Sequence, residues 1–142
     1  MEQEVRREDG PHKDITAAIL KAAFAVSNAL GSGFLEKVYE NALTLELRTM
    51  GLDVFQQVPV RILYRGQDVG EYCADMVVNR AVLVETKATE THHPIYEAQT
   101  LNYLKALNLQ VGLLLNFGLP KLQYKRLVLS DKHRMLAPDE PA

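Results

Sequence analysis

The stretch VGEYCADMVVNRAVLVETK, residues 69–87, decides the fold, because it has the pattern of two neighbouring strands joined by a tight turn. Two apolar runs, 76–78 and 82–84, flank the pair Asn79-Arg80, and asparagine is a common turn residue. Unbroken apolar runs are typical of strands that are buried on both faces. We therefore predict strands at about 69–78 and 81–87, paired as a hairpin inside a sheet.

Polar residues interrupt this apolar hairpin at Asp75, Glu85 and Lys87. Glu85 and Lys87 are two residues apart, so they project from the same face of their strand. Whether Asp75 joins them depends on the register of the hairpin. A three-residue loop at 79–81 places Asp75 opposite Glu85, whereas a two-residue turn at 79–80 places the two acids on opposite faces.

Two carboxylates that face each other in an apolar hairpin repel each other and lose hydration, so they require a cation. Carboxylate oxygens suit Mg²⁺ or Mn²⁺, and Mg²⁺ binds one or two carboxylates while keeping several waters. Lys87 could orient a water molecule and stabilise negative charge that develops on a phosphate. The alternative is an ordinary hairpin in which Lys87 forms a salt bridge with one acid.

Outward from the hairpin, the sequence predicts helices and further strands on both sides. We expect Asp14 to be the N-cap of a first helix that Gly31 ends, and Pro94 to lie in the first turn of a third helix. The pattern predicts an α/β fold with a mixed central β-sheet flanked by helices, in the order α-α-β-β-β-α-β-β. Its helices are expected at 14–30, 34–50 and 94–107, and its strands at 54–64, 69–78, 81–87, 111–117 and 124–129.

Two polar residues on the predicted helices are further candidates. Glu36 projects at the edge of the apolar face of the second helix, and Gln99 projects among apolar residues of the third. Buried polar side chains need polar partners, and a shared metal site would supply them. The alternative is that both side chains reach solvent at the helix margins. Glu46 falls in the same apolar face, and we interpret it as one partner of a structural ion pair.

Length and composition limit the class of protein. A chain of 142 residues fits one domain, and we expect a flexible arm at 1–12, the domain at 13–130 and a flexible tail at 131–142. We expect no secretory leader and no membrane span. The single cysteine, Cys73, cannot form an internal disulfide, so we expect an inert core residue in a cytoplasmic protein. The net charge of -2 argues against a broad basic surface, so any nucleic-acid contact must come from a local basic patch.

The segment Gly33-Phe34-Leu35-Glu36-Lys37-Val38-Tyr39 has the form G-x-x-E-x-x-Y. With it, the chain resembles the GxxExxY protein family of the PD-(D/E)XK nuclease superfamily. The resemblance covers most of residues 13–130. It continues through Gln57, Gly70-Glu71-Tyr72, Ala74-Asp75, Glu85-Thr86-Lys87-Ala88, Ala98-Gln99, Asn102-Tyr103-Leu104 and the segment Gly112 to Gly118.

This resemblance implies a restriction-endonuclease-like core with a catalytic site. Asp75, Glu85 and Glu36 would serve as metal ligands, Lys87 would be the catalytic lysine, and Gln99 would match a helix-borne polar position. Ala74 stands where the superfamily name has proline. The implied cofactor is Mg²⁺ or Mn²⁺.

The resemblance further implies a Mg²⁺-dependent nuclease that acts on nucleic acid, with DNA preferred over RNA. Two other functions stay open: a non-catalytic nucleic-acid- or protein-binding module that keeps the fold, which the net charge mildly favours, and a scaffold subunit of a larger complex. We expect no membrane partner, and the sequence leaves a homodimer open.

Overall fold

The computed structural model describes residues 10–130, so most of the arm expected at 1–12 and all of the tail expected at 131–142 lie outside the described residues. The predicted order of helices and strands is confirmed. The elements are α2 (Lys13–Leu30), α3 (Glu36–Thr49), β1 (Val54–Tyr64), β2 (Gln67–Val78), β3 (Val82–Lys87), α4 (Pro94–Leu107), β4 (Val111–Asn116) and β5 (Gln123–Val128).

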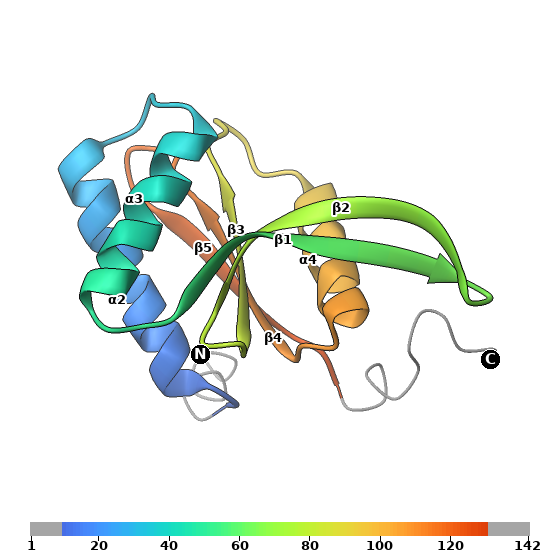
Figure 1. The fold of residues 1–142 in the computed structure, drawn as a ribbon. Helices are drawn as coiled ribbons and strands as arrows, with labels where there is room; N and C mark the ends of the chain where they lie inside the picture. Colours follow the sequence, from blue (N-terminus) through green and yellow to red (C-terminus); the bar gives the residue numbers. More distant parts are fainter. Residues whose placement is uncertain (1–9, 131–142) are drawn as a thin grey trace.

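The five strands form one mixed sheet in the order β1-β2-β3-β4-β5. Only the β3–β4 pair is parallel among these strands, and α4 makes the crossover that a parallel pair requires. In Figure 1, α2 and α3 cover one face of the sheet and α4 covers the other. Both β3 and β4 are therefore buried on two sides, as their unbroken apolar runs predict.

Two apolar clusters hold these layers together, one on each face of the sheet. The cluster under α2 and α3 includes Ile19, Tyr39 and Leu43, all fully buried. The cluster under α4 includes Leu104 and the strand residue Leu83. Neighbouring residues of β3 alternate between the clusters, since Val82 and Val84 face α2 and α3 while Leu83 faces α4.

The β2–β3 register settles the question that the hairpin sequence left open. Val78 pairs with Val82 and Met76 pairs with Val84, so a three-residue loop, 79–81, joins the strands. Asn79 and Arg80 both have positive φ, and the amide of Ala81 donates to the carbonyl of Val78 at 3.0 Å. This register brings Asp75 opposite Glu85, which is the arrangement that a shared cation site requires.

The outer half of the β1–β2 hairpin projects beyond the other strands and past α4 (Figure 1). With 11 and 12 residues, β1 and β2 are about twice as long as their neighbours, so their outer residues are covered less. Cys73 lies in this part and is exposed. The expectation of a buried, inert Cys73 is therefore wrong, because the apolar run that suggested burial starts only at Met76.

The first helix begins and ends close to the predicted residues, but its cap differs. Its N-cap is His12, in a left-handed conformation without a side-chain cap bond, and Asp14 lies in the first turn. The predicted N-cap role of Asp14 is thus wrong. Gly31, with φ of 70°, ends the helix as expected. Within residues 10–130, no helix combines the length and the apolar character that crossing a membrane needs.

Candidate active site

The candidate residues gather at one end of the sheet. In Figure 1 the start of α3, the end of β3 and the loop from β3 to α4 lie at that end. Glu36 is the first residue of α3, and Lys87 is the last residue of β3. The topology therefore brings together residues that lie about fifty positions apart in the chain.

At this end of the sheet, hydrogen bonds to the side chains of Asp75 and Glu85 take the place of the backbone hydrogen bonds between β2 and β3. Backbone pairing of β2 and β3 ends at Met76–Val84. At the next position the amide of Asp75 donates to Oε2 of Glu85 at 2.8 Å. The amide and the hydroxyl of Thr86 donate to Oδ2 of Asp75, at 2.7 and 2.9 Å. Each carboxylate is thus fixed by the backbone of the strand that carries the other.

One oxygen of each carboxylate remains without a hydrogen bond in the described part of the chain, namely Oδ1 of Asp75 and Oε1 of Glu85. Burial and the neighbouring Asp75 charge raise the pKa of Glu85 to about 8. Burial also raises the pKa of Asp75, although the two bonds from Thr86 oppose this change. Two carboxylates with raised pKa values and one free oxygen each form a site at which a cation is favourable.

Lys87 lies beside these carboxylates without pairing with either. Its Nζ lies 4.8 Å from the ring centroid of Tyr96, in α4. Its positive charge lowers the pKa values of Glu85, Asp75 and Glu36, which places it within electrostatic reach of all three. Among the described residues Lys87 forms no salt bridge, so the alternative of an ordinary salt-bridged hairpin does not hold.

Glu36 faces the same group of charges from α3. Burial raises its pKa, and the negative charges of Asp75 and Glu40 raise it further. Across residues 10–130, however, no three His, Cys, Asp or Glu side chains lie close enough together to hold a metal ion. Asp75 and Glu85 are thus brought together directly, and direct ligation by Glu36 stays a prediction.

Tyr39 explains why α3 begins at Glu36. The Tyr39 hydroxyl donates to the carbonyl of Gly31 at 2.6 Å and accepts from the amide of Phe34 at 3.1 Å. Its ring stacks on Phe117 at 4.8 Å between centroids. The tyrosine therefore closes the loop between α2 and α3 and fixes the residue at which α3 starts.

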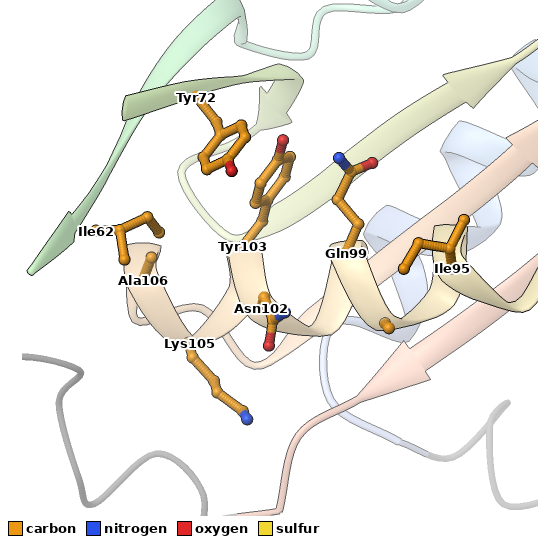
Figure 2. A pocket seen from close by; sticks show the side chains of 9 residues that line it. Ile62, Tyr72, Ile95, Gln99, Asn102, Tyr103, Lys105 and Ala106 are labelled. Carbon is orange, nitrogen blue, oxygen red and sulfur yellow. The ribbon is translucent and has the colours of Figure 1, made fainter. Parts of the chain in front are cut away.

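Gln99 and Tyr103 lie one turn apart on α4 and point to the same side, toward β2 (Figure 2). Burial raises the pKa of Tyr103 to about 12, and the negative charge of Glu85 adds to this change. Gln99 lines a groove with Tyr72 and Tyr103. Its proposed catalytic role stays a prediction.

Glu40 is a buried acid at this site that the sequence reasoning missed. Its carboxylate accepts from the side-chain amides of Gln56 at 2.8 Å and Gln57 at 3.1 and 3.2 Å, and it forms an ion pair with Lys37 at 3.2 Å. Its charge raises the pKa of Asp75. The spacing of Glu36 and Glu40, four residues on one helix face, was the signal that could have revealed it.

Glu46 differs from the expectation. It is half-buried, but within the described residues it forms no ion pair, so its interpretation as an ion-pair partner is wrong. The acid of α3 that is buried and paired is Glu40, six residues closer to the site.

Asn116 holds the chain that follows Lys87. Its Oδ1 accepts from the amides of Thr89 at 3.1 Å and Gly118 at 2.9 Å, and its Nδ2 donates to the carbonyl of Thr89 at 3.1 Å. The amide of Phe117 donates to the carbonyl of Lys87 at 2.8 Å. The end of β4 therefore sets the course of the backbone beyond the lysine.

Comparison with known proteins agrees with this geometry. A family model described as the PD-(D/E)XK nuclease superfamily matches residues 13–127, most of the chain. No curated protein and no solved structure gives a significant match. The matched range contains every candidate residue of the site.

Proposed function

The chain belongs to the PD-(D/E)XK nuclease superfamily, and from this premise we propose that it is a Mg²⁺- or Mn²⁺-dependent nuclease. It hydrolyses phosphodiester bonds in nucleic acid, DNA in preference to RNA. The observation that carries this proposal is the pair of carboxylates, Asp75 and Glu85, beside Lys87. Within residues 10–130 each carboxylate keeps one oxygen without a hydrogen bond, and Lys87 forms no salt bridge. The G-x-x-E-x-x-Y segment supports a closer relationship with the GxxExxY family.

The donor set fits a hard divalent cation. Asp75 and Glu85 offer carboxylate oxygens, which Mg²⁺ and Mn²⁺ prefer, and the absence of a third close ligand within residues 10–130 suits an ion that keeps several waters. Their raised pKa values show that the ionised carboxylates are disfavoured here, so a bound cation would stabilise them. A bound divalent cation would polarise the phosphate and lower the pKa of a bound water.

We assign a separate role to each residue of the site. Asp75 and Glu85 hold the cation, and their bonds to each other's strands keep them oriented without rearrangement. Lys87 places a positive charge where negative charge develops on the phosphate oxygens. Glu36, at the start of α3, adds a further carboxylate, which would orient a water molecule.

The test is cleavage of labelled single- and double-stranded DNA and of RNA, with Mg²⁺, Mn²⁺ or a chelator. Asp75→Ala removes a cation ligand, and Lys87→Ala removes charge stabilisation worth ~3 kcal/mol or more, or at least a hundredfold in rate. Each variant should abolish cleavage and remain folded by circular dichroism. Undiminished metal-dependent cleavage in both variants would show that the chemistry lies elsewhere.

The alternative, a non-catalytic binding module, gives a different result in the same assay. The wild-type protein would then cleave no substrate with any divalent ion, and its nucleic-acid binding would not respond to Asp75→Ala. We also propose a cytoplasmic location, based on the lone cysteine, Cys73. Sedimentation of the full chain would decide between a monomer and the homodimer that the sequence leaves open.

A further inference from the structure

A groove lies between α4 and the outer part of the β1–β2 hairpin (Figure 2). It encloses about 410 Å³, a volume within the range of small-molecule sites. The hairpin contributes Ile62 and Tyr72 to its walls, and α4 contributes Ile95, Gln99 and Tyr103. The groove therefore exists because the hairpin is long enough to reach past α4.

Two tyrosines form the aromatic wall of this groove. Tyr72 is 53% exposed, whereas Tyr103 is buried, and their ring centroids lie 5.9 Å apart at 42°. An exposed ring that rests against a buried one is held in place and still presents aromatic surface to solvent. Such a surface suits stacking by another flat ring.

Gln99 is the polar side chain of the groove that lies beside Tyr103, and Asn102 and Lys105 add exposed polar groups further along α4. The side chain of Gln99 is half-buried and has no hydrogen-bond partner among the described residues. An amide side chain can donate and accept hydrogen bonds at once. A groove that combines aromatic and aliphatic walls with amide side chains suits a heteroaromatic ring that has both donors and acceptors on its edge, as a nucleobase does.

Helix α4 links the groove to the candidate active site. Gln99 and Tyr103 lie in the groove, and both belong to the helix that carries Tyr96. Lys87 contacts the ring of Tyr96, one turn before Gln99 on α4. A nucleotide whose phosphate lies at Lys87 would therefore have a base within reach of the groove.

We propose that this groove binds one unstacked nucleobase beside the phosphodiester that is cleaved, so that single-stranded nucleic acid is the preferred substrate. This inference rests on the proposed nuclease function and adds its substrate class. In a duplex the bases are stacked on each other and cannot reach Tyr72. Because the net charge is -2, stacking would supply affinity that a basic surface supplies in other proteins.

The experiment measures binding of the full chain in chelator to three labelled ligands of equal length: a single strand, a duplex and an abasic strand. The proteins are wild type, Tyr72→Ala, Tyr72→Phe and Tyr64→Ala. Tyr64 is a matched control, since it is a 61% exposed tyrosine on the same hairpin that does not line the groove.

Wild type should prefer the single strand to the duplex. Tyr72→Ala should weaken single-strand binding about 5- to 150-fold, the equivalent of ~1–3 kcal/mol for one stacked base. Tyr72→Phe keeps the ring and should bind like wild type, as should Tyr64→Ala. The abasic strand, which has the phosphates without the bases, should bind wild type and Tyr72→Ala equally.

Several results would overturn the inference. They are equal binding of single strand and duplex, no effect of Tyr72→Ala, or an equal loss in Tyr64→Ala. A dimer that Tyr72→Ala dissociates without changing binding would make the groove a subunit interface instead. A parallel assay with Mn²⁺ separates the two proposals: cleavage without strand preference removes only the groove assignment, and Tyr72-dependent binding without any cleavage removes only the nuclease.

Discussion

At the scale of single residues, the break in the sheet at Asp75 explains how two acids can lie in an apolar hairpin. Gln57 stands opposite Asp75 on β1, between the paired positions Gln56–Met76 and Val58–Ala74, and has a positive φ of 54°. Glu85 stands opposite on β3. Because the ladder is interrupted on both sides of Asp75, polar side chains replace strand bonds there. Backbone in a rarely populated region often occurs at functional sites.

The carboxylate of Glu40 holds the side chains of Gln56 and Gln57 at this interruption of the β1–β2 ladder, so a substitution of Glu40 gives a prediction. Glu40→Gln should lower the free energy of unfolding by about 1–3 kcal/mol, because it removes charge-assisted hydrogen bonds from the amides of Gln56 and Gln57. Chemical denaturation measures the change. Glu46→Gln, on the same helix without an ion pair in residues 10–130, should change stability by less than about 0.5 kcal/mol. Equal effects of the two substitutions would contradict the anchoring role.

At the scale of elements, the turn after β4 packs directly on the segment after β3. A Cβ added at Gly118 would lie 2.3 Å from the amide nitrogen and the carbonyl oxygen of Thr89. Gly118→Ala must therefore displace the backbone that follows Lys87. We expect a loss of about 1–3 kcal/mol in unfolding free energy, together with a loss of cleavage greater than the loss of folded protein.

Gly70→Ala is the control for this prediction. Gly70 lies in β2 without positive φ, and an added Cβ there would meet no atom within 4 Å. Thermal unfolding and cleavage should both match wild type. If Gly118→Ala also leaves cleavage per folded molecule unchanged, the course of this segment does not position Lys87.

The start of α3 gives a second prediction at this scale. Tyr39→Phe keeps the stacking on Phe117 and removes the hydroxyl that bridges Gly31 and Phe34. We expect a loss of about 1–2 kcal/mol in unfolding free energy. Amide hydrogen exchange should become faster in residues 31–36. Unchanged exchange there would show that the hydroxyl does not fix the start of the helix.

At the scale of the whole molecule, the order of the elements followed from periodicity, whereas the site followed only in part. The apolar runs around Asn79 predicted buried strands, but they left two registers open, and only the three-residue loop of the structure brings Asp75 opposite Glu85. Glu40 escaped notice because a buried acid and an exposed one have the same sequence pattern until the partners are known. Here the partners are Gln56 and Gln57, on a strand that only the fold brings near.

Cys73 and Glu46 were misjudged for the same reason. The local sequence pattern assigns a residue to a strand or to a helix face. Its burial, however, depends on which other elements of the fold cover that residue. The projecting half of the β1–β2 hairpin leaves Cys73 exposed, and the sequence alone does not determine how far that hairpin extends past α4.

The site also determines how the stability of the metal-free protein depends on pH. The pKa of Glu85 rises from 4.5 to about 8 in the folded protein, and the pKa values of Asp75 and Glu36 rise too. Below 4.5 Glu85 is protonated in both folded and unfolded chains. Between 4.5 and about 8 the unfolded chain loses this proton and the folded protein keeps it, so stability falls as pH rises.

We therefore expect the unfolding free energy, measured in chelator, to fall by several kcal/mol across this window, given ~1.4 kcal/mol per pH unit for each such group. Glu85→Gln carries no ionisable group and should flatten most of the fall. Mg²⁺ or Mn²⁺ should restore stability at the upper end in wild type, because a ligand that binds only the folded state stabilises it by mass action. The same ions should do little for Asp75→Asn combined with Glu85→Gln. Stability that stays level or rises across the window in chelator would mean that Glu85 is ionised in the folded protein without a cation, and that the carboxylate pair does not need one.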